Sequence, residues 1–503
     1  MKYYWMIIAI FVIGQSAIAN ESKHRSFPKI TDVRHFECTP SELQNLSYAI
    51  YPDDPQYNTV RLIFNKRFTY FPKAIITPRT FKQAQYVVRI FKKYHLPFSV
   101  RSGGHCHEPG SLSSDYVLDL QKFNDIILDE EQGEVYIGAG ALLGNVIQKL
   151  GEIGYAIPTG TCPSVGVAGL SLGGGIGYLS RPFGLTCDSI KSITLLNADA
   201  EVIEVNQSNY PDLFWALRGG GNGSFGAVLG FTFQMHKVPV VTFYELIWEW
   251  DFQLIPSIFD AWQSWVQTLP NNITSVLGIR HPQELCAIPE DSPPLVIKVT
   301  GLKVGSEPFT EWKTGFKHLK PKVKTFTGSY LEISKYWTIE SLLPFNKAKS
   351  RILMKPINQK TITKISRFFE KLEEENPDYL VYFDFEVFGG AVQDSQSAFF
   401  PRKAFGWWLQ AYYWDHPEQT KKILTKSNNF YSEIPDEVSK FCYTNIVDYD
   451  LGKGYLPLYY GDHVDRLIKI KKKYDPTNLF HWKQSIPTKK NYSSQPFFSR
   501  NSS

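Results

Sequence analysis

The hydrophobic pattern of the first half of the chain alternates between helical and strand-like spacing. At residues 80–94 the apolar side chains share one helical face, which predicts a helix that packs on a core. Short apolar runs at 98–100, 116–120 and 134–137 predict strands, and 142–150 is expected to be a second helix. Another short helix is expected at 41–50. Short strands that alternate with helices predict an α+β fold.

The pattern changes beyond Pro239. Strand-like segments at 243–250, 295–302 and 379–388 alternate with segments of helical spacing at 252–269, 361–372 and 417–431. A chain of 503 residues is too long for a single hydrophobic core, so we expect two or three domains. The second domain should be layered and extend to about residue 438, and a late helix is expected at 461–474.

The N-terminus has the features of a secretory signal peptide. Lys2 is followed by an apolar run over residues 3–13 and by Ala17-Ile18-Ala19. We therefore expect residues 1–19 to be removed and the mature protein to be secreted or periplasmic. The alternative is an uncleaved N-terminal anchor. No later segment is long and apolar enough to span a bilayer, so no membrane span is expected in the mature protein.

Charge and composition narrow the possible functions. The chain has 54 basic and 49 acidic residues, and a net charge of +5 is small for this length. The one dense basic run, at 469–473, is expected to be the solvated face of a helix. We therefore expect no nucleic-acid partner. We also expect no metal site. Aromatic residues make up 15% of the chain, which suits large cores and also a site that stacks on flat or sugar-like ligands.

Three glycine clusters carry most of the functional information. They lie at 101–105, 157–177 and 218–223. Glycine lets the main chain approach a ligand closely, and exposed peptide N–H groups can hold phosphate. Three clusters predict a long anionic cofactor with several contact points.

The third cluster contains a spacing that could be mistaken for a nicotinamide site. Gly221, Gly223 and Gly226 fit the dinucleotide fingerprint. That fingerprint requires a strand before it and a helix after it. Here a helix is predicted at 213–217 and a strand at 228–233, so we reject a nicotinamide-binding site.

Several segments resemble, in order, those of the berberine-bridge-enzyme-like FAD-linked oxidases, which have a flavin domain of the vanillyl-alcohol-oxidase or PCMH type. The resemblance begins at Arg101-Ser102-Gly103-Gly104-His105 and continues through 160–169, 172–177 and 213–221. Near the C-terminus, 443–445 and 473–480 also match. The resemblance covers nearly the whole mature chain, and the histidine and cysteine loops are specific when they occur together.

The resemblance implies FAD held by two covalent bonds. His105 would bond to the 8α-methyl group of the isoalloxazine and the Cys162 sulfur to C6. A neutral imidazole nitrogen and a thiolate are nucleophiles able to attack an electron-poor ring. Without the resemblance, the histidine would be interpreted as a structural turn residue and the cysteine as a buried thiol or disulfide partner.

The remaining cofactor contacts follow from the same resemblance. They are Arg101, Ser102, Gly103, Gly104, Val165, Gly166, Gly169, Gly174, Gly177 and Asn445. In the family, the residue three positions after the cysteine lies beside flavin C4a and influences oxygen access. Here it is Val165, a small residue associated with oxidase behaviour, which favours O2 as the acceptor.

The cysteines add one expectation. There are six of them, namely Cys38, Cys106, Cys162, Cys187, Cys286 and Cys442. If Cys162 is bonded to the flavin, an odd number remains, and at least one free thiol is expected.

The chain departs from the family at the position that often supplies the catalytic base. The family often uses the second tyrosine of a Tyr-x-Asn-Tyr segment, but here the segment is Tyr443-Thr444-Asn445-Ile446. Tyr443 could replace it only if the local register differs. Asp384 and Glu386 are better candidates, because residues two apart on a strand point to one face. Flanking aromatic residues should enclose them partly and raise their pKa values.

The expected architecture and function follow from these residues. We expect a two-subdomain FAD-binding domain at 20–240, an α+β substrate domain at 241–438 with an antiparallel sheet covered by helices, a C-terminal return to the FAD domain at 439–487, and a loose tail at 488–503. The resemblance implies an oxidase that transfers hydride from a C–OH group, or alternatively from a C–N or C–C position, to flavin N5 and gives H2O2 from O2. Gln410 matches a substrate-contacting glutamine of some sugar oxidases, and a sugar or oligosaccharide is the leading substrate. Alternatives are a secondary metabolite such as an alkaloid or polyketide, or a flavin-binding surface protein without turnover.

Overall fold

The computed structural model describes residues 40–249, 252–281, 296–337, 344–375, 377–436 and 438–490. The predicted signal peptide at 1–19, Cys38, Cys286 and most of the predicted tail lie outside these residues. The chain divides into two units, 1–44 and 45–503, and the described part of the first unit contains one 3₁₀ turn at Ser41–Leu43. None of the helices in the described ranges has the length and apolar character needed to cross a bilayer.

The helix predicted at 41–50 is wrong. The 3₁₀ turn is followed by Asn45 with a φ of 59°, in the left-handed region, and this conformation ends a right-handed helix. Ala49–Ile50 then forms strand β1.

The first sheet positions the first glycine loop. Its four strands have the order β1-β2-β4-β3, with β2 at Ala74–Ile76, β3 at Phe98–Arg101 and β4 at Tyr116–Asp119. Helix α3, Phe81–Lys93, connects β2 to β3 and confirms the helix predicted at 80–94. It begins after Thr80, whose side chain accepts a hydrogen bond from Gln83 N–H, as N-cap residues do. Strands β2 and β3 both run parallel to β4.

The second sheet is antiparallel and has five strands in the order β5-β6-β10-β8-β9. Their bounds are Ile126–Asp129, Glu134–Gly138, Ala227–Gln234, Ile190–Leu196 and Val202–Asn206. Helix α4 covers Leu143–Gly151, as predicted. Helix α7, Pro211–Gly220, precedes the third glycine cluster and strand β10 follows it. This helix-to-strand order confirms the rejection of a nicotinamide fingerprint.

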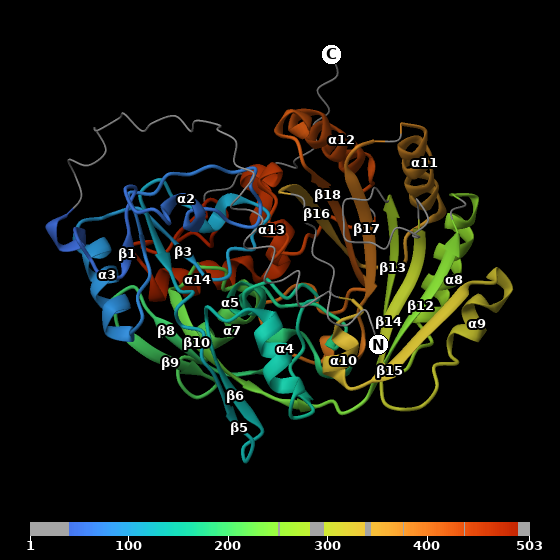
Figure 1. Cartoon of the computed structure of the whole chain (residues 1–503), viewed down its shortest axis with the longest axis horizontal. Coiled ribbons are helices and arrows are strands. Elements are labelled where there is room, and N and C mark those ends of the chain that lie inside the picture. The colour runs from blue at the N-terminus through green and yellow to red at the C-terminus, as the bar shows by residue number, and fades with distance from the viewer. Residues whose placement is uncertain are drawn as a thin grey trace. The chain divides into compact units, whose positions relative to one another are not determined.

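The third sheet is antiparallel and has seven strands in the order β15-β12-β14-β13-β17-β18-β16. Their bounds are Lys322–Gly328, Val241–Glu249, Val296–Val304, Ile273–His281, Leu380–Val387, Gly406–Trp414 and Phe345–Leu353. One face is covered by the helices α8, α11 and α12, at Ile255–Val266, Gln359–Glu375 and Thr420–Glu433 (Figure 1). A large apolar core lies between these helices and the sheet. The expected antiparallel sheet covered by helices is confirmed.

The C-terminal segment packs on the glycine-rich part of the chain. Helix α14, Val464–Tyr474, carries the basic run, but Lys471 is fully buried rather than solvated. Its ammonium group donates to Asp475 at 2.6 Å and to the carbonyls of Ser224 and Phe480. The prediction of a solvated face is therefore wrong for Lys471, because three buried acceptors compensate its charge.

Candidate active site

His105 follows strand β3 on a glycine turn. Arg101, the last residue of β3, forms a buried ion pair with Asp119, with Nε 2.8 Å from the carboxylate. Gly104 has a φ of 66°, a left-handed conformation that glycine adopts without steric cost. Its carbonyl accepts a hydrogen bond from Phe64 N–H at 2.9 Å. These contacts fix the turn that carries His105.

The His105 imidazole is held as a neutral ring. It stacks on Phe64 with the ring centroids 3.9 Å apart and the planes 14° from parallel. Burial lowers its pKa to about 3, and the neighbouring His107 adds to the effect. Nε2 is buried and finds no hydrogen-bond partner among the described residues. A neutral ring with an unengaged nitrogen fits the role of a nucleophile that bonds to an electron-poor cofactor.

The Cys162 loop contacts the His105 loop directly. A Cβ on Gly103 would lie 2.5 Å from the backbone N and Cα of Gly166. The two backbone segments can therefore approach this closely only because position 103 is a glycine. Val165 N–H donates to the Cys162 carbonyl at 3.3 Å, and the Val165 carbonyl accepts from Leu143 N–H at 2.9 Å. The structure thus brings the two predicted attachment loops together.

Gly103→Ala is expected to lower the free energy of unfolding by about 1–3 kcal/mol, because the added methyl group overpacks a backbone contact. A thermal unfolding curve measures this. Gly160→Ala is the matched control in the same region, since its Cβ would meet only side-chain and carbonyl atoms at 3.6 Å or more. Equal melting temperatures for the two variants would contradict the close approach of the loops.

The glycine loop at 173–177 is held by the C-terminal segment. Gly174 and Gly177 lie in it, after helix α5, Val167–Leu172. The hydroxyl of Tyr443 accepts hydrogen bonds from Gly175 N–H at 3.0 Å and from Asn445 Nδ2 at 2.8 Å. Burial raises the pKa of Tyr443. This side chain therefore positions the loop, and the arrangement does not favour the prediction that it is the catalytic base.

Two further predicted contacts occupy different surroundings. The Ser102 hydroxyl donates to the Ala139 carbonyl. Gly169 is exposed on α5, and no described heavy atom lies within 4 Å of a Cβ placed there. The exposed position leaves room for a ligand to approach the main chain at Gly169.

The sheet face opposite the helices borders both attachment residues. Tyr413 packs on Phe64, the ring that stacks on His105, at 6.4 Å between centroids. Tyr382 stacks on Tyr413 at 5.9 Å. Burial raises the pKa of Tyr382 well above its usual value, and repulsion from neighbouring groups that include Cys162 contributes. The aromatic residues of this face therefore lie beside the two loops.

The two predicted carboxylates lie on this face and are partly enclosed, as expected. Glu386 is 9% exposed; its Oε2 accepts from Trp407 Nε1 at 3.1 Å, and its Oε1 has no partner within the described part of the chain. Burial raises the pKa of Glu386 to about 7, and the charge of Asp384 adds to this. Burial also raises the pKa of Asp384, which Arg280, 3.5 Å away, partly offsets. Glu386 is thus poised to accept a proton near neutral pH.

Gln410 does not join this face. It pairs with Phe383 across the sheet, and directly opposed residues of an antiparallel pair point to the same side. Phe383, together with Trp408 and Tyr412 on either side of Gln410, lies in the core beneath the helices. The predicted contact of Gln410 with substrate is therefore corrected, because the strand register turns its side chain toward the helices.

Other residues of this face were not predicted from the sequence. Tyr178 follows Gly177, and its hydroxyl lies 3.2 Å from Thr300 Oγ1. Burial raises its pKa, with smaller contributions from Glu386 and Asp384, which places it near the carboxylates. Trp407 and Arg280 were also missed. Alternation along β18 could have indicated Trp407, but Arg280 is brought in by the pairing of β13 with β17.

Two other features bear on earlier expectations. Within the described residues Cys106, Cys187 and Cys442 are free thiols, which confirms that at least one exists.

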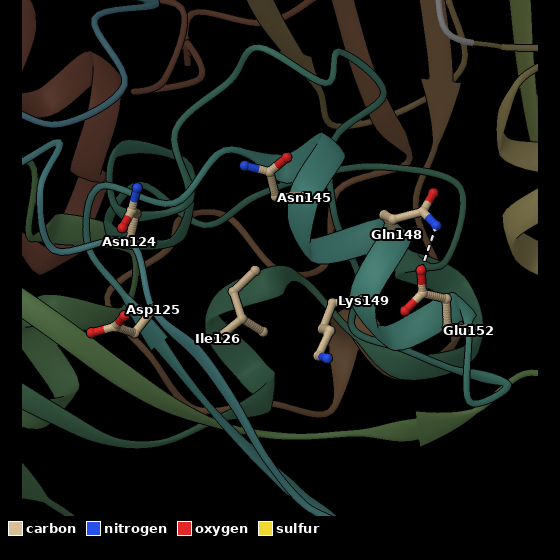
Figure 2. Close-up of a pocket in the computed structure, with 7 residues that line it drawn as sticks. All are labelled: Asn124, Asp125, Ile126, Asn145, Gln148, Lys149 and Glu152. Carbon is tan, nitrogen blue, oxygen red and sulfur yellow. Dashed lines mark hydrogen bonds between the residues drawn. The ribbon is translucent and has the colours of Figure 1, made fainter.

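A surface hollow lies between the segment 124–126 and helix α4, where Gln148 forms a hydrogen bond with Glu152 at 2.6 Å (Figure 2). Its described lining holds none of the predicted site residues, so we assign it no role.

Comparisons with known proteins agree with this geometry. Residues 72–206 match the family described as FAD binding domain, and residues 442–487 match the family described as Berberine and berberine like. An uncharacterized FAD-linked oxidoreductase of Bacillus subtilis, YgaK, is 31% identical over 453 residues, which are 86% of this chain and 95% of that protein. Reticuline oxidase of Eschscholzia californica is 27% identical over 84% of each chain. The solved structure of BBE-like 1 from Physcomitrella patens is 26% identical, has a TM-score of 0.78, and aligns with 88% of this chain and 97% of its own.

Proposed function

Since this chain belongs to the berberine-bridge-enzyme-like FAD-linked oxidases, we propose that it oxidises a C–OH group with FAD bonded to both His105 and Cys162. When bound, the flavin supplies the hydride acceptor at N5 and passes the electrons to O2, which gives H2O2. The observation that carries the proposal is the position of Glu386. Its Oε1 has no partner among the described residues, and its side chain lies on the side of the sheet that borders the two attachment loops.

The chain contributes two groups to attachment. His105 offers a neutral imidazole, because its pKa of about 3 leaves it unprotonated at physiological pH. Cys162 lies on the loop that contacts the His105 turn through Gly103 and Gly166. Two bonds from two loops would hold the ring in front of the carboxylates and exclude alternative orientations.

The chain also contributes the base. As hydride leaves a substrate carbon, the hydroxyl on that carbon must lose its proton. Glu386 would accept this proton at Oε1, while Trp407 fixes the carboxylate through Oε2. A carboxylate with a pKa of about 7 accepts a proton more readily than an ordinary one.

The pH dependence of kcat/KM tests the base. Only the ionised carboxylate can accept the proton, so kcat/KM should reach a plateau above pH 7 and fall about tenfold per unit below it. Asp384→Asn should move this acidic limb of the profile, the fall of kcat/KM below pH 7, to lower pH, because the charge of Asp384 raises the pKa of Glu386. A limb that stays near pH 7 in this variant, or moves upward, would rule out Glu386 as the titrating base.

A sugar or oligosaccharide is the substrate class that we propose. Tyr382 is partly buried and the rings of Tyr413 and Trp407 are buried beside it, while Asp384 and Glu386 place hydrogen-bond acceptors on the same sheet face. Carbohydrates combine apolar ring faces with hydroxyl donors and suit such a surface. Export through the signal peptide at 1–19 would place the enzyme in contact with extracellular or periplasmic sugars.

Ile446 supports a second candidate, a flavin-binding protein without turnover, because the family often has a tyrosine at this position. Peroxide release over a panel of mono- and oligosaccharides, alcohols, alkaloids and polyketides separates the candidates. Peroxide formed with sugars supports our proposal. Activity confined to alkaloids or polyketides would show that the substrate is a secondary metabolite and not a sugar, as the resemblance to reticuline oxidase would allow. A flavin that no substrate reduces favours the candidate without turnover.

A further inference from the structure

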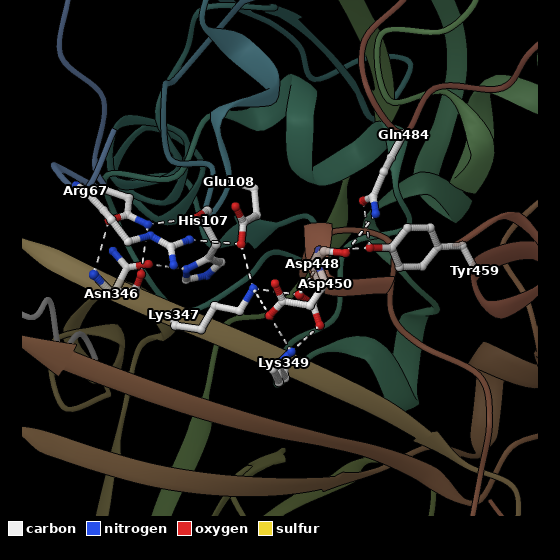
Figure 3. A network of polar contacts seen from close by, with 11 residues as sticks. Arg67, His107, Glu108, Asn346, Lys347, Lys349, Asp448, Asp450, Tyr459 and Gln484 are labelled. Carbon is white, nitrogen blue, oxygen red and sulfur yellow. Dashed lines mark hydrogen bonds and ion pairs between the residues drawn. The ribbon is translucent and has the colours of Figure 1, made fainter. Parts of the chain in front are cut away.

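A buried network of charges joins the segment after His105 to the seven-stranded sheet and to the C-terminal segment (Figure 3). It contains three cations and three carboxylates, which are Arg67, Lys347, Lys349, Glu108, Asp448 and Asp450. The side chains of Glu108, Lys347, Lys349 and Asp448 are at most 4% exposed. Charges buried this deeply depend on their partners.

Lys347 is the junction of this network. Its ammonium lies 2.7 Å from Glu108 Oε1, 2.6 Å from Asp448 Oδ1 and 2.9 Å from Asp450 Oδ2. Burial lowers its pKa, but the three carboxylates more than offset this and the pKa is raised, so the residue stays charged. Lys349 is equally buried and binds Asp448 and Asp450, but none of its described ion pairs reaches Glu108.

Asn346, the neighbour of Lys347 on strand β16, contacts His107, the residue before Glu108. Asn346 Oδ1 lies 2.8 Å from His107 Nδ1. Asn65 Nδ2 donates to the carbonyls of both His107 and Asn346, at 2.7 and 3.0 Å. Two successive residues of β16 therefore fix positions 107 and 108, which are two and three residues after His105.

We propose that Lys347 is a positioning residue for the covalent attachment of flavin at His105. This proposal rests on the histidyl bond of the proposed function. The His105 ring is held by stacking on Phe64 and its Nε2 has no described partner, so its place depends on the backbone on either side. Loss of Lys347 would leave the buried carboxylate of Glu108 next to Asp448 without the ammonium between them, and the segment would move. A displacement of about 1 Å can slow a reaction between positioned groups by roughly 100-fold.

Formation of the histidyl bond determines which atoms must be aligned. His105 gives the lone pair of a ring nitrogen to the 8α-carbon, one proton leaves that carbon and one leaves the imidazole, and the two electrons released reduce the flavin, from which O2 removes them as H2O2. The reaction requires the ring nitrogen of His105 to lie next to the 8α-carbon. The charge network can affect only the position of this nitrogen, because it contacts the segment that carries His105.

The test uses full-length Cys162→Ala as the background, in which His105 is the only proposed attachment residue. Adding Lys347→Met should lower the ratio of acid-stable flavin to protein by about tenfold or more, whereas adding Lys349→Met should leave it within about twofold. Lys347→Met with Cys162 intact should keep its flavin acid-stable through the cysteinyl bond, which a general loss of structure would not allow.

A second variant keeps the proposal testable if Lys347→Met fails to fold. Glu108→Ala removes the ion pairs of the segment with Lys347 and Arg67 and leaves Lys347 paired with Asp448 and Asp450. It should also lower the acid-stable flavin of Cys162→Ala. Unchanged flavin with Glu108→Ala or Lys347→Met, or equal losses with Lys349→Met, would overturn the proposal. Loss of acid-stable flavin in Cys162→Ala alone would instead show that the histidyl bond of the proposed function does not form, and the positioning role would fall with it.

Discussion

Glu386→Gln is expected to lower kcat by ~10²- to 10⁴-fold, the range that a positioned general base contributes. Glutamine keeps the volume and can still accept the hydrogen bond from Trp407 Nε1, but its amide cannot take the substrate proton. The flavin content should not change, because Glu386 lies on the sheet and not in the attachment loops. Single-turnover reduction of the flavin by substrate, followed by absorbance, measures the effect directly.

Asp384→Asn is the control for this result. Asp384 shares the face with Glu386 but pairs with Arg280, so its loss should shift the pH profile and cost far less in kcat at pH 9. If Glu386→Gln reduced its flavin as fast as the parent protein, the base would have to be a different group. If both variants lost activity equally at high pH, the two carboxylates would have to act as a pair.

The double variant His105→Ala/Cys162→Ala is expected to release all of its flavin on acid precipitation, whereas each single variant should retain it. Each remaining bond is sufficient to hold the ring to the polypeptide. The single variants should also turn over more slowly, because two covalent bonds are expected to raise the flavin potential. Acid precipitation and a mass spectrum of the digested protein identify the modified peptide in each case.

Cys106→Ala is the matched control for the cysteine. Cys106 is next to His105, but burial raises the pKa of its thiol to about 11, so it is not the thiolate that attachment requires. Flavin that became acid-labile in His105→Ala alone would show that Cys162 carries no bond. Flavin that stayed in the pellet of the double variant would point to a third attachment residue.

Local sequence patterns predicted the elements whose formation depends on residues close together in the sequence. Thr80 caps α3 where the apolar face begins, and the glycines after β3 predicted the turn in which Gly104 adopts a left-handed φ without steric cost. The carboxylates of β17 were found because alternation along a strand fixes their common face. The attachment residues came from the family resemblance, and the geometry around His105 fits them.

The remaining features depend on contacts between distant segments. Gln410 was assigned to the wrong face because its side is set by the register of β18 with β17. Lys471 was expected in solvent because its acceptors, such as the Ser224 carbonyl, come from another part of the chain. Strand β16 was not predicted, since Lys347 and Lys349 interrupt its hydrophobic pattern and are compensated by Glu108 and Asp448.

The most direct test of the account is the absorbance spectrum of the purified protein before and after acid precipitation. We expect a flavin spectrum in the native protein and a yellow pellet with a colourless supernatant, because His105 and Cys162 hold the ring covalently. Colour released to the supernatant would leave a flavoprotein but contradict covalent attachment. A protein that stays colourless after FAD is added would contradict the proposed oxidase itself.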